Sequence, residues 1–298
     1  MRHRHGQAAH PDAQQAVAQQ TVAQQTALPT EGLRYRAQNL ERATAHVVTV
    51  PPAYKVTVAI ADETTDALTP VAAIAQSQGA IAALNAGFFD PQNGQTTSYI
   101  TIDGELIADP RDNGRLMDNP DLLPYREQIL NRSEFRRYRC SGLDREDSHF
   151  RYGIAPHSSP PPCGCHIVDV VGGGPSLLPL TSEAEGFVAE VDGARIRDAL
   201  GETQPNARSA VGITPEGEVL LVAVEQRPEL DRSGVSLPEL ADLMRSLGAQ
   251  TALNLDGGSS TTLYYQGQTY AGRWVEGAPV ERPVKSALVV MDGATAAP

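Results

Sequence analysis

Alternation of apolar and polar residues is the dominant pattern along this chain, and it predicts strands more often than helices. Two alternating segments, 44–50 and 54–61, flank a Pro-Pro pair and predict two separate strands. Residues 98–108 alternate around an Asp-Gly pair, which is typical of a two-residue hairpin turn. Apolar runs and hairpin patterns predict further strands within 81–89, 166–171, 208–227, 250–255, 261–270 and 285–293.

Helical spacing predicts two helices, each with recognisable start and stop signals. The first is expected to follow Thr69 as its N-cap, with Pro70 in the first helical position. The second is expected to follow Ser236, because Glu239 three residues later completes the spacing of a capping box. A glycine ends each predicted helix, since glycine readily adopts the left-handed backbone that follows a last helical turn. These two glycines are Gly79 and Gly248.

Predicted hairpins outnumber predicted helices, and the helices do not alternate regularly with strands as they would in a parallel α/β fold. We therefore predict an α+β fold, in which a mostly antiparallel sheet system carries a few packed helices. The two helix–strand units also resemble each other, because Gly79 precedes Asn85 by the same six positions that separate Gly248 from Asn254. We interpret this as an internal duplication with a pseudo-twofold relation, which would bring both asparagines to one pocket. Chance similarity between two short units is the alternative.

Residues 1–30 differ from the rest of the chain, being rich in Gln and Ala and poor in large apolar residues. We predict a disordered or loosely helical tail there, followed by one domain over residues 31–298. The tail lacks the apolar stretch of a signal peptide, and no segment approaches the roughly 18 apolar residues of a membrane span. A net charge of −12 argues against nucleic acid as a partner, whereas a small phosphate ligand needs only one or two arginines.

Residues 109–165 are rich in Arg, Asp, Pro and Ser and are predicted to form an insertion or lid-like excursion. A helix is expected within it at 121–138. The arginine-rich cluster at 131–140 could face an acidic ligand, although a solvated helix face is the plainer interpretation.

Three cysteines lie in this region, and an odd number leaves at least one of them without an intramolecular partner. Cys163 and Cys165 are followed by His166, and Cys140 lies upstream. A single disulfide, free thiols, and a zinc site of three thiolates and one imidazole are all open interpretations. The C-x-C spacing departs from the usual C-x-x-C zinc knuckle.

The stretch TALNLDGGSSTTLYY, residues 251–265, carries the most specific candidate chemistry. A buried strand leads into a carboxylate, two glycines and four hydroxyl residues. Glycines let the backbone approach a ligand closely, and successive N–H groups in such a turn can bind an anion. The predicted site residues of this loop are Asn254, Asp256, Gly257, Gly258, Ser259 and Ser260.

Further candidates lie at other strand ends. A second glycine-rich loop at 172–175 lacks the spacing of a dinucleotide site or a P-loop, and we expect it to bend tightly beside a cleft. Arginines at strand ends suit phosphate or carboxylate, because the guanidinium offers a fork of donors with a fixed charge. These candidates are Asn85, Gly87, Gly173, Gly174, Arg208, Glu225, Arg227 and Arg282.

Neither a nucleophile elbow nor a zinc-protease motif is found, and most of the histidines lie in the tail or in 109–165. We therefore expect carboxylates, amides, hydroxyls and arginine to carry any reaction. Calcium could also bind among Asn85, Asp90, Asn254 and Asp256, since it prefers oxygen ligands. Within that set, Asp256 and Asp90 are the expected carboxylate ligands.

The strings ALNAGFFD, VVGGGPSLL, NARSAVGIT, TALNLDGGSST and ERPVKSALVV together resemble the phosphodiester glycosidase family, over roughly residues 40–292. This resemblance implies hydrolysis of the bond between an amino sugar, similar to N-acetylglucosamine, and a phosphodiester. It also implies a sugar-phosphate or glycan substrate and a periplasmic or secreted location. One departure is Glu225-Gln226-Arg227, where the family often has Asp-Gly-Arg.

Within this resemblance, Asp256 is the expected catalytic carboxylate and Glu225 the second, with exchanged roles as an alternative. Arg208 or Arg282 would stabilise the charge that builds on the departing phosphate. Other functions on the same scaffold are hydrolysis of a different cell-wall or exopolysaccharide linkage and carbohydrate binding without catalysis.

Overall fold

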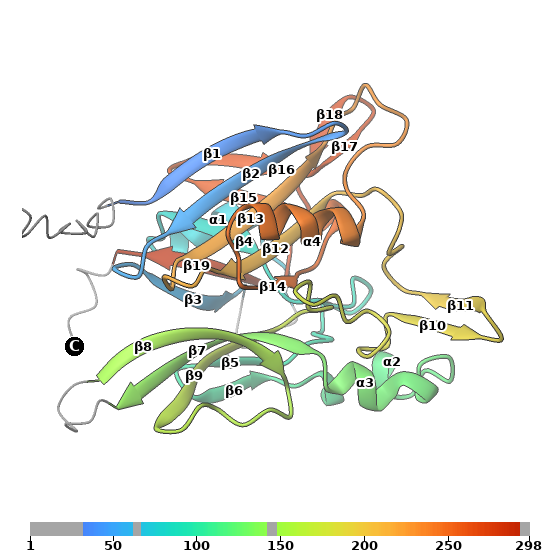
Figure 1. Ribbon diagram of the computed structural model, residues 1–298, viewed down its shortest axis with the longest axis horizontal. Coiled ribbons are helices and arrows are strands. Elements are labelled where there is room, and N and C mark those ends of the chain that lie inside the picture. Colours follow the sequence, from blue (N-terminus) through green and yellow to red (C-terminus); the bar gives the residue numbers. More distant parts are fainter. Residues whose placement is uncertain (1–31, 62–66, 142–147, 293–298) are drawn as a thin grey trace, which may run out of the picture. The chain divides into compact units, whose positions relative to one another are not determined.

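The computed structural model describes residues 32–61, 67–141 and 148–292 (Figure 1). Within these ranges the chain forms 19 strands and four short α-helices. Every pairing between named strands is antiparallel. The predicted α+β class is therefore confirmed. The predicted tail, residues 1–30, lies outside the described residues, and none of the described helices has the length and hydropathy that crossing a bilayer requires.

Sheet A consists, in spatial order, of β1 (Arg34–Asn39), β2 (Ala43–Val50), β13 (Val219–Gln226), β12 (Arg208–Ile213) and β14 (Thr251–Asn254). Its side chains alternate between two buried layers, as a period of two requires. Val48 and Leu221 point into a central core. Val47 and Val222 point to the opposite face, which is covered by α4 (Leu237–Ser246).

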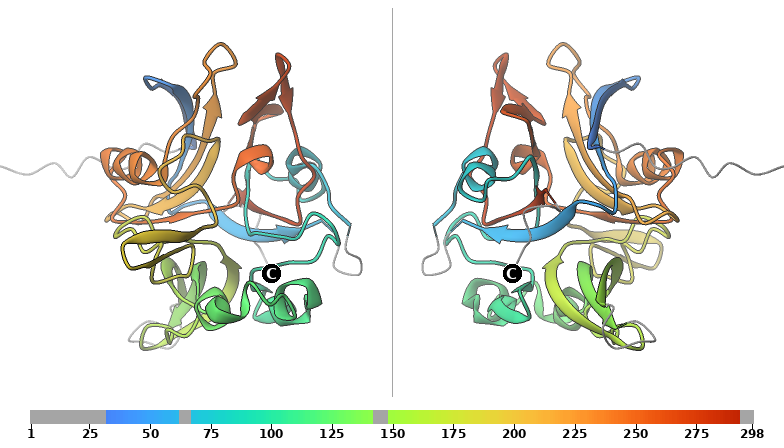
Figure 2. Two further views of the ribbon diagram at one scale, coloured as in Figure 1. Left: turned by 90° about the vertical axis from the view of Figure 1, so that its right-hand side faces the viewer. Right: turned by 90° about the vertical axis from the view of Figure 1, so that its left-hand side faces the viewer.

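Sheet B consists, in spatial order, of β16 (Gln268–Ala271), β15 (Thr262–Tyr265), β4 (Ala82–Asn85), β19 (Ser286–Met291) and β3 (Lys55–Ile60). Leu84 and Leu288 point into the same central core as sheet A. Ala83 and Val289 point outward against α1 (Val71–Ser77). The two sheets thus face each other, with α1 and α4 on their outer sides (Figure 2).

Sheet C consists, in spatial order, of β6 (Glu105–Ala108), β5 (Ile100–Ile102), β9 (Cys165–Gly172), β7 (Ser133–Ser141) and β8 (Ser148–Pro156). Ile100, Phe135 and Val171 extend the central core that sheets A and B share. Three sheets therefore bury one continuous apolar centre.

Short elements connect the three sheets. Two separate hairpins pair β10 with β11 and β17 with β18. Their bounds are β10 (Val188–Val191), β11 (Ala194–Asp198), β17 (Arg273–Val275) and β18 (Ala278–Val280). The remaining helices are α2 (Gly114–Met117) and α3 (Arg126–Leu130), with 3-10 turns η1 (Pro110–Asp112), η2 (Leu123–Tyr125) and η3 (Gly258–Ser260).

Both predicted helices form, as α1 and α4. α4 has the predicted capping box, because Ser236 accepts from the Glu239 N–H and the Glu239 carboxylate accepts from the Ser236 N–H. The predicted N-cap of α1 is wrong, since Pro70 occupies that position without a side-chain cap. The Thr69 backbone instead exchanges two hydrogen bonds with Val284, at 2.9 and 3.0 Å.

The predicted helix at 121–138 is also wrong. Only η2 and α3 form there, and β7 begins at Ser133. In β7, Phe135 enters the central core, while buried Arg136 and Arg137 pair with Glu134 and Asp169. Tertiary packing in the middle of a sheet thus overrides the polar composition that suggested a solvated or ligand-facing surface. The status of 109–165 as an insertion stays a prediction, but its residues supply β7 and β8 of sheet C.

The proposed internal duplication stays a prediction. Both helix–strand units form, as α1 with β4 and α4 with β14. β4 lies inside sheet B, whereas β14 lies at the edge of sheet A. The hairpin after β14 joins sheet B and the hairpin after β4 joins sheet C, so the surroundings of the two units differ.

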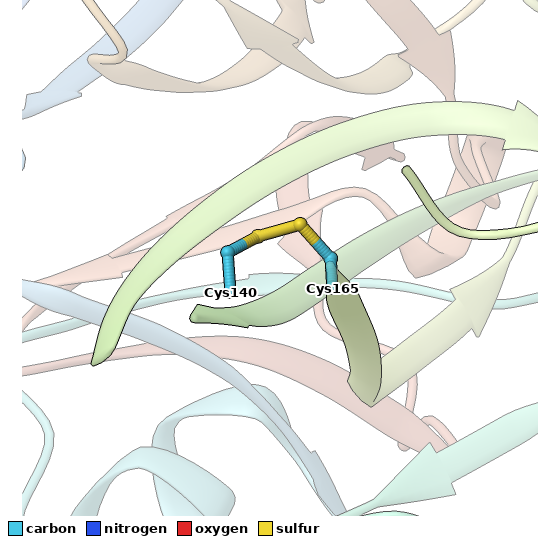
Figure 3. Close-up of a disulfide and its surroundings, with 2 residues drawn as sticks. All are labelled: Cys140 and Cys165. Carbon is cyan, nitrogen blue, oxygen red and sulfur yellow. A yellow bond between two sulfur atoms is a disulfide. The ribbon is translucent and has the colours of Figure 1, made fainter. Parts of the chain in front are cut away.

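Cys140 and Cys165 form a disulfide between β7 and β9, where the two residues lie directly opposite each other (Figure 3). Cys163 is free and exposed. This settles the open interpretations in favour of one disulfide, because two of the three thiolates of a zinc site are consumed. Disulfides persist in oxidising compartments, which agrees with a periplasmic or secreted location, itself still a prediction.

We expect removal of the disulfide by Cys140→Ser with Cys165→Ser to lower the free energy of unfolding by about 3 kcal/mol. The bond closes a loop with a sequence separation of 25, and cross-linking such a loop restricts the unfolded chain. Urea unfolding without reductant measures the difference. Cys163→Ser is the control and should leave the midpoint unchanged; equal effects of the two changes would contradict the assigned pairing.

Candidate active site

The glycine-rich loop after β14 is held between the ends of two sheets. The Asp256 N–H donates to the Ala86 carbonyl just beyond β4, at 3.0 Å. The Gly258 N–H donates to the Ala207 carbonyl just before β12, at 2.8 Å. The loop therefore closes the end of the space between sheets A and B.

One buried side-chain amide, that of Asn85, ties this junction together. Its Nδ2 donates to the Asp256 carbonyl at 2.6 Å. Its Oδ1 accepts from the Ser209 hydroxyl at 2.6 Å and from the Thr262 N–H at 3.1 Å. Asn85 thus connects β4, β12, β15 and the loop, with three of its four hydrogen-bonding positions in use. Substrate binding by Asn85 stays a prediction, and this geometry favours a positioning role.

The second glycine loop packs against the end of β14. The Gly174 N–H donates to the Asn254 carbonyl and the Asn254 Nδ2 donates to the Gly174 carbonyl, both at 2.8 Å. A Cβ at Gly173 would lie 2.8 Å from the Asn254 carbonyl oxygen, so only glycine permits this approach. The Gly87 N–H donates to the Ser286 hydroxyl at 3.1 Å. The structure therefore gathers both loops and the Gly87 turn at one end of the sheets.

Buried polar atoms without a protein hydrogen-bond partner concentrate in the loop that follows β14. Among the described residues, four of the five such side-chain atoms come from positions 254–262. A buried polar atom left unpaired is costly, so native proteins usually satisfy it with a water or a ligand. The four are Asn254 Oδ1, Ser260 Oγ, Thr261 Oγ1 and Thr262 Oγ1. They mark a place where a polar ligand would complete the hydrogen bonding.

Asp256 is the titratable group of this polar region. Burial of its carboxyl raises its pKa to about 6. The Ser260 hydroxyl, which lies nearby but outside hydrogen-bonding geometry, opposes this increase, as do the Gly257 N–H at 3.0 Å and the charge of Arg282. A carboxyl with a pKa near neutrality can exchange protons at physiological pH, which suits an acid or a base in catalysis.

The two candidate arginines have different environments. Arg208 is buried on the face of β12 opposite Ser209, and its guanidinium donates to four backbone carbonyls. This burial lowers its pKa to about 10. Arg282 is exposed, and its backbone N–H donates to the Ser259 carbonyl at 3.3 Å. The charge of its guanidinium acts to lower the pKa of Asp256. Anion binding by either stays a prediction, and the geometry favours Arg282.

Glu225, the second predicted carboxylate, is bound at both oxygens. Oε2 contacts His46 Nε2 at 2.7 Å, and Oε1 accepts from Trp274 Nε1 at 2.7 Å. Burial raises the pKa of Glu225, but the two hydrogen bonds and the nearby imidazole outweigh it, and the net pKa is lowered. Because an ionised carboxylate only accepts hydrogen bonds, His46 carries a proton on Nε2. Glu225 is thus held ionised in a fixed orientation.

Aromatic rings enclose the hydrogen-bonded pair of Glu225 and His46. Tyr35 contacts His46 Nδ1 through its hydroxyl at 2.8 Å, and its ring stacks on Tyr265 and Tyr270. Burial, together with Tyr270 and Glu225, raises the pKa of Tyr35, so its hydroxyl stays protonated. The ring of His46 also stacks on Tyr270, with the centroids 4.5 Å apart.

Two backbone hydrogen bonds connect this cluster to the glycine loop. The Gln226 N–H, next to Glu225, donates to the Gly272 carbonyl, and the Gly272 N–H donates to the Thr261 carbonyl, both at 2.7 Å. β17, which carries Trp274, also contacts η3 of the loop. The two carboxylates therefore belong to adjoining parts of one structural region.

Sequence reasoning missed the partners of Glu225. His46 had a detectable signal, because it occupies a core-facing position of β2 in phase with Val48 and Val50. A polar residue at such a position needs a buried partner. Tyr35 lies in β1, which was not predicted as a strand, and Trp274 is the single tryptophan of the chain.

The described residues contain no group of three or more His, Cys, Asp or Glu side chains arranged to hold a metal ion. The carboxylate of Asp90 instead forms an ion pair with Arg115 at 2.6 Å and accepts from the Gln92 N–H. Calcium binding at Asp256 and Asp90 stays a prediction.

A model of the family described as phosphodiester glycosidase matches residues 78–291. No curated protein sequence matches the chain. Among solved structures, a hypothetical protein from Synechocystis has 19% sequence identity to this chain and a TM-score of 0.57. The match covers 87% of this chain and 61% of the Synechocystis chain. The chain thus spans about three fifths of that protein.

Two other structures are similar at comparable levels. The zebrafish N-acetylglucosamine-1-phosphodiester alpha-N-acetylglucosaminidase catalytic domain, auto-inhibited by its pro-peptide, has 18% identity and a TM-score of 0.58, covering 87% of this chain and 82% of that one. A putative exported protein from Burkholderia pseudomallei has 15% sequence identity and a TM-score of 0.54. The match covers 84% of this chain and 74% of the Burkholderia chain. At these identities the structures show a shared fold.

Asp256→Asn should make the protein more stable at pH 7, by about 1–3 kcal/mol. The Asp256 carboxyl keeps its proton up to about pH 6 in the folded state, whereas its ordinary pKa is 3.8. Wild-type stability therefore falls as pH rises from about 4 to 6, and asparagine removes this dependence. Urea unfolding across pH 3–8 measures it. Asp242→Asn, on the exposed face of α4, is the control; a matching pH dependence in both variants would refute the raised pKa of Asp256.

His46→Phe should destabilise the protein by about 1–3 kcal/mol at pH 7, because Glu225 would remain charged with only one donor. The lowered pKa of Glu225 contributes stability above its unfolded pKa, and this contribution is lost as pH falls through the folded pKa. The difference should therefore shrink at pH 3. Tyr35→Phe keeps the ring stack and should cost about 1 kcal/mol. A larger loss for Tyr35→Phe than for His46→Phe would contradict the described network.

Proposed function

Because the chain belongs to the phosphodiester glycosidase family, we propose that it hydrolyses the glycosidic bond between an amino sugar and a phosphodiester. The products are the free sugar and a phosphate monoester. The observation that carries this proposal is the loop at 254–262, where one carboxyl with a pKa near 6 lies among buried polar atoms that lack protein partners. A sugar supplies the hydroxyl and amide groups that such atoms would bind.

The proposed reaction replaces the bond between the anomeric carbon and the phosphate oxygen with a bond to water. Asp256, ionised in most molecules at neutral pH, accepts the proton of the attacking water. The departing phosphate monoester ionises with a pKa of about 6, so it leaves as an anion with little need for protonation. This explains why one carboxyl with a moderate pKa could suffice where ordinary glycosidases need a strong general acid.

Arg282 is the proposed phosphate contact. Its guanidinium is exposed beside the loop, whereas that of Arg208 is already bound to backbone carbonyls. A fixed positive charge near the departing oxygen stabilises the charge that develops there. We assign Glu225 to stabilisation of the positive charge on the sugar ring, because its hydrogen bonds hold it ionised.

The zebrafish enzyme that shares this fold is named for N-acetylglucosamine-1-phosphodiester, which makes that compound the first substrate to assay. We expect wild type to release free N-acetylglucosamine from a methyl phosphodiester of N-acetylglucosamine-1-phosphate. Asp256→Asn should lower kcat by about 100–10,000-fold, since a positioned acid–base group contributes that much. Arg282→Ala should lower kcat/KM by about 100-fold.

Arg245→Ala on the outer surface of α4 is the matched control for charge removal, and it should keep wild-type kinetics. Thermal unfolding verifies that each variant is folded. Turnover by Asp256→Asn at the wild-type rate would overturn the assignment of this carboxyl. Turnover of a plain N-acetylglucosaminide in place of the phosphodiester would move the proposal to another linkage.

A further inference from the structure

Two arginines come together where the β10–β11 hairpin lies beside α3 (Figure 1). Arg132 follows α3, and its Nε donates to the Glu185 carbonyl at 3.2 Å. Arg197 lies in β11, and its Nε donates to the Gly186 carbonyl at 2.7 Å. The two acceptors belong to consecutive residues, and the charge of Arg197 acts on Arg132. We call Arg132 and Arg197 the arginine pair.

Each guanidinium of the arginine pair lies over an aromatic ring. The Arg132 guanidinium lies 3.7 Å from the centroid of Phe187, and that of Arg197 lies 4.7 Å from the centroid of Tyr125. One hydrogen bond and one ring therefore fix each group. The terminal nitrogens of both donate to no protein atom within the described ranges, and both side chains are half-buried. A guanidinium fork held in this way suits a phosphate or a carboxylate, which accepts two parallel hydrogen bonds.

The carboxylate whose charge acts on Arg132 is that of Glu185, and it is already occupied. It is buried and accepts four hydrogen bonds, from the Ser133 N–H and hydroxyl, the Ser176 N–H and the Thr181 hydroxyl. Burial lowers the pKa of Arg132 to about 9, against the charge of Glu185 and together with the charge of Arg197. The repulsion between the two arginines is thus only partly relieved, and a bound anion would relieve the rest.

The acidic residues of the neighbouring hairpin pair with a different arginine. Arg195, two positions before Arg197, contacts Glu190 at 3.4 Å, Asp198 at 3.5 Å and Glu202 at 3.1 Å. Within the part of the chain that the structure describes, neither member of the arginine pair forms an ion pair. Arg195 therefore has its acceptors inside the protein, whereas the arginine pair presents donors without acceptors.

Aromatic packing connects the arginine pair to the candidate active site. The Phe187 ring packs on Gly174, where a Cβ would lie 2.8 Å from Phe187 Cε2, and Gly174 bonds to Asn254 at the end of β14. Phe187 also contacts Phe88, just beyond the end of β4, with the ring centroids 5.9 Å apart. The Arg132 guanidinium thus lies one aromatic ring away from the end of the sheets that carries both glycine loops.

We propose that the arginine pair binds a second anionic group of the substrate, a carboxylate or phosphate carried by the alcohol that leaves with the phosphate. This inference rests on the proposed function, in which Arg282 contacts the phosphate of the cleaved bond. N-acetylglucosamine itself is neutral, so a further negative charge belongs to the leaving side. Arg132 comes from the segment 109–165, so this segment would select substrates with at least two negative charges.

Three diesters of N-acetylglucosamine-1-phosphate test the proposal. Their alcohols are 6-hydroxyhexanoate, the monophosphate of hexane-1,6-diol, and hexan-1-ol as the neutral match. Calorimetric titration into Asp256→Asn measures affinity whether or not the wild type hydrolyses them. At least one acidic diester should bind about 10-fold or more tightly than the hexyl diester at low salt, and 0.5 M NaCl should remove most of this preference. Which acidic diester binds better identifies the group as carboxylate or phosphate.

Arg132→Gln and Arg197→Gln, each combined with Asp256→Asn, should reduce the preference for the acidic diester to about 2-fold or less while leaving the affinity for the hexyl diester unchanged. Arg195→Gln in the same background is the matched control and should keep the preference, because its guanidinium already contacts carboxylates. Unfolding temperatures verify that each variant is folded. Arg197→Gln alone decides the test if Arg132→Gln does not fold.

Equal affinity for the acidic and neutral diesters, or an unchanged preference in the arginine variants, would overturn the proposal. A matching loss of affinity for the hexyl diester would also overturn it, because the phosphate of the cleaved bond would then lie at the arginine pair. An intact preference without turnover of any diester by wild type would contradict the proposed hydrolysis and leave the arginine pair as a binding site for the acidic group.

Discussion

The arrangement of this protein depends on a buried amide at the point where two sheets meet. Asn85 lies at the end of β4 in sheet B and bonds to Ser209 in sheet A, to Thr262 in β15 and to the Asp256 carbonyl. Apolar packing between the sheets is non-directional and would tolerate small shifts of one sheet against the other. Hydrogen bonds to one amide are directional, so they fix the relative position of the strands and set where the Asp256 carboxyl lies.

This constraint accounts for the unusual polarity of the loop that follows β14. The N–H groups of Asp256 and Gly258 tie the loop to Ala86 and Ala207, so the position of its backbone is set without its side chains. Several of them are buried without a protein partner, and the Asp256 carboxyl loses hydration to the extent that its pKa rises to about 6. Both features cost stability, and both suit a site that a polar ligand completes. The Glu225 cluster shows the opposite solution, since both oxygens of its carboxylate are paired and the carboxylate is held ionised.

Alternation predicted β2, and short apolar runs bounded by turn residues predicted β13, β4 and β19, because both faces of these three strands are buried. The α+β class and α4 with its capping box also follow from local signals. Local composition failed at 121–138, where Arg136 is buried in an ion pair with Glu134 of the same strand and Arg137 in one with Asp169 of the neighbouring strand β9. The loop at 254–262 was identifiable from its sequence, whereas the pairing of His46 with Glu225 arises only from the register of β2 and β13. The bonding of Arg208 to four carbonyls was likewise invisible in the sequence, because those carbonyls belong to irregular segments.

The most direct test of this account is a crystal structure of Asp256→Asn bound to a methyl phosphodiester of N-acetylglucosamine-1-phosphate. The account predicts the sugar against the loop at 254–262, with hydrogen bonds to Thr261 or Thr262 and the anomeric carbon beside residue 256. It also predicts the phosphate within reach of Arg282. A sugar bound elsewhere, with the loop side chains contacting only water, would contradict the claim that this loop is the reaction centre.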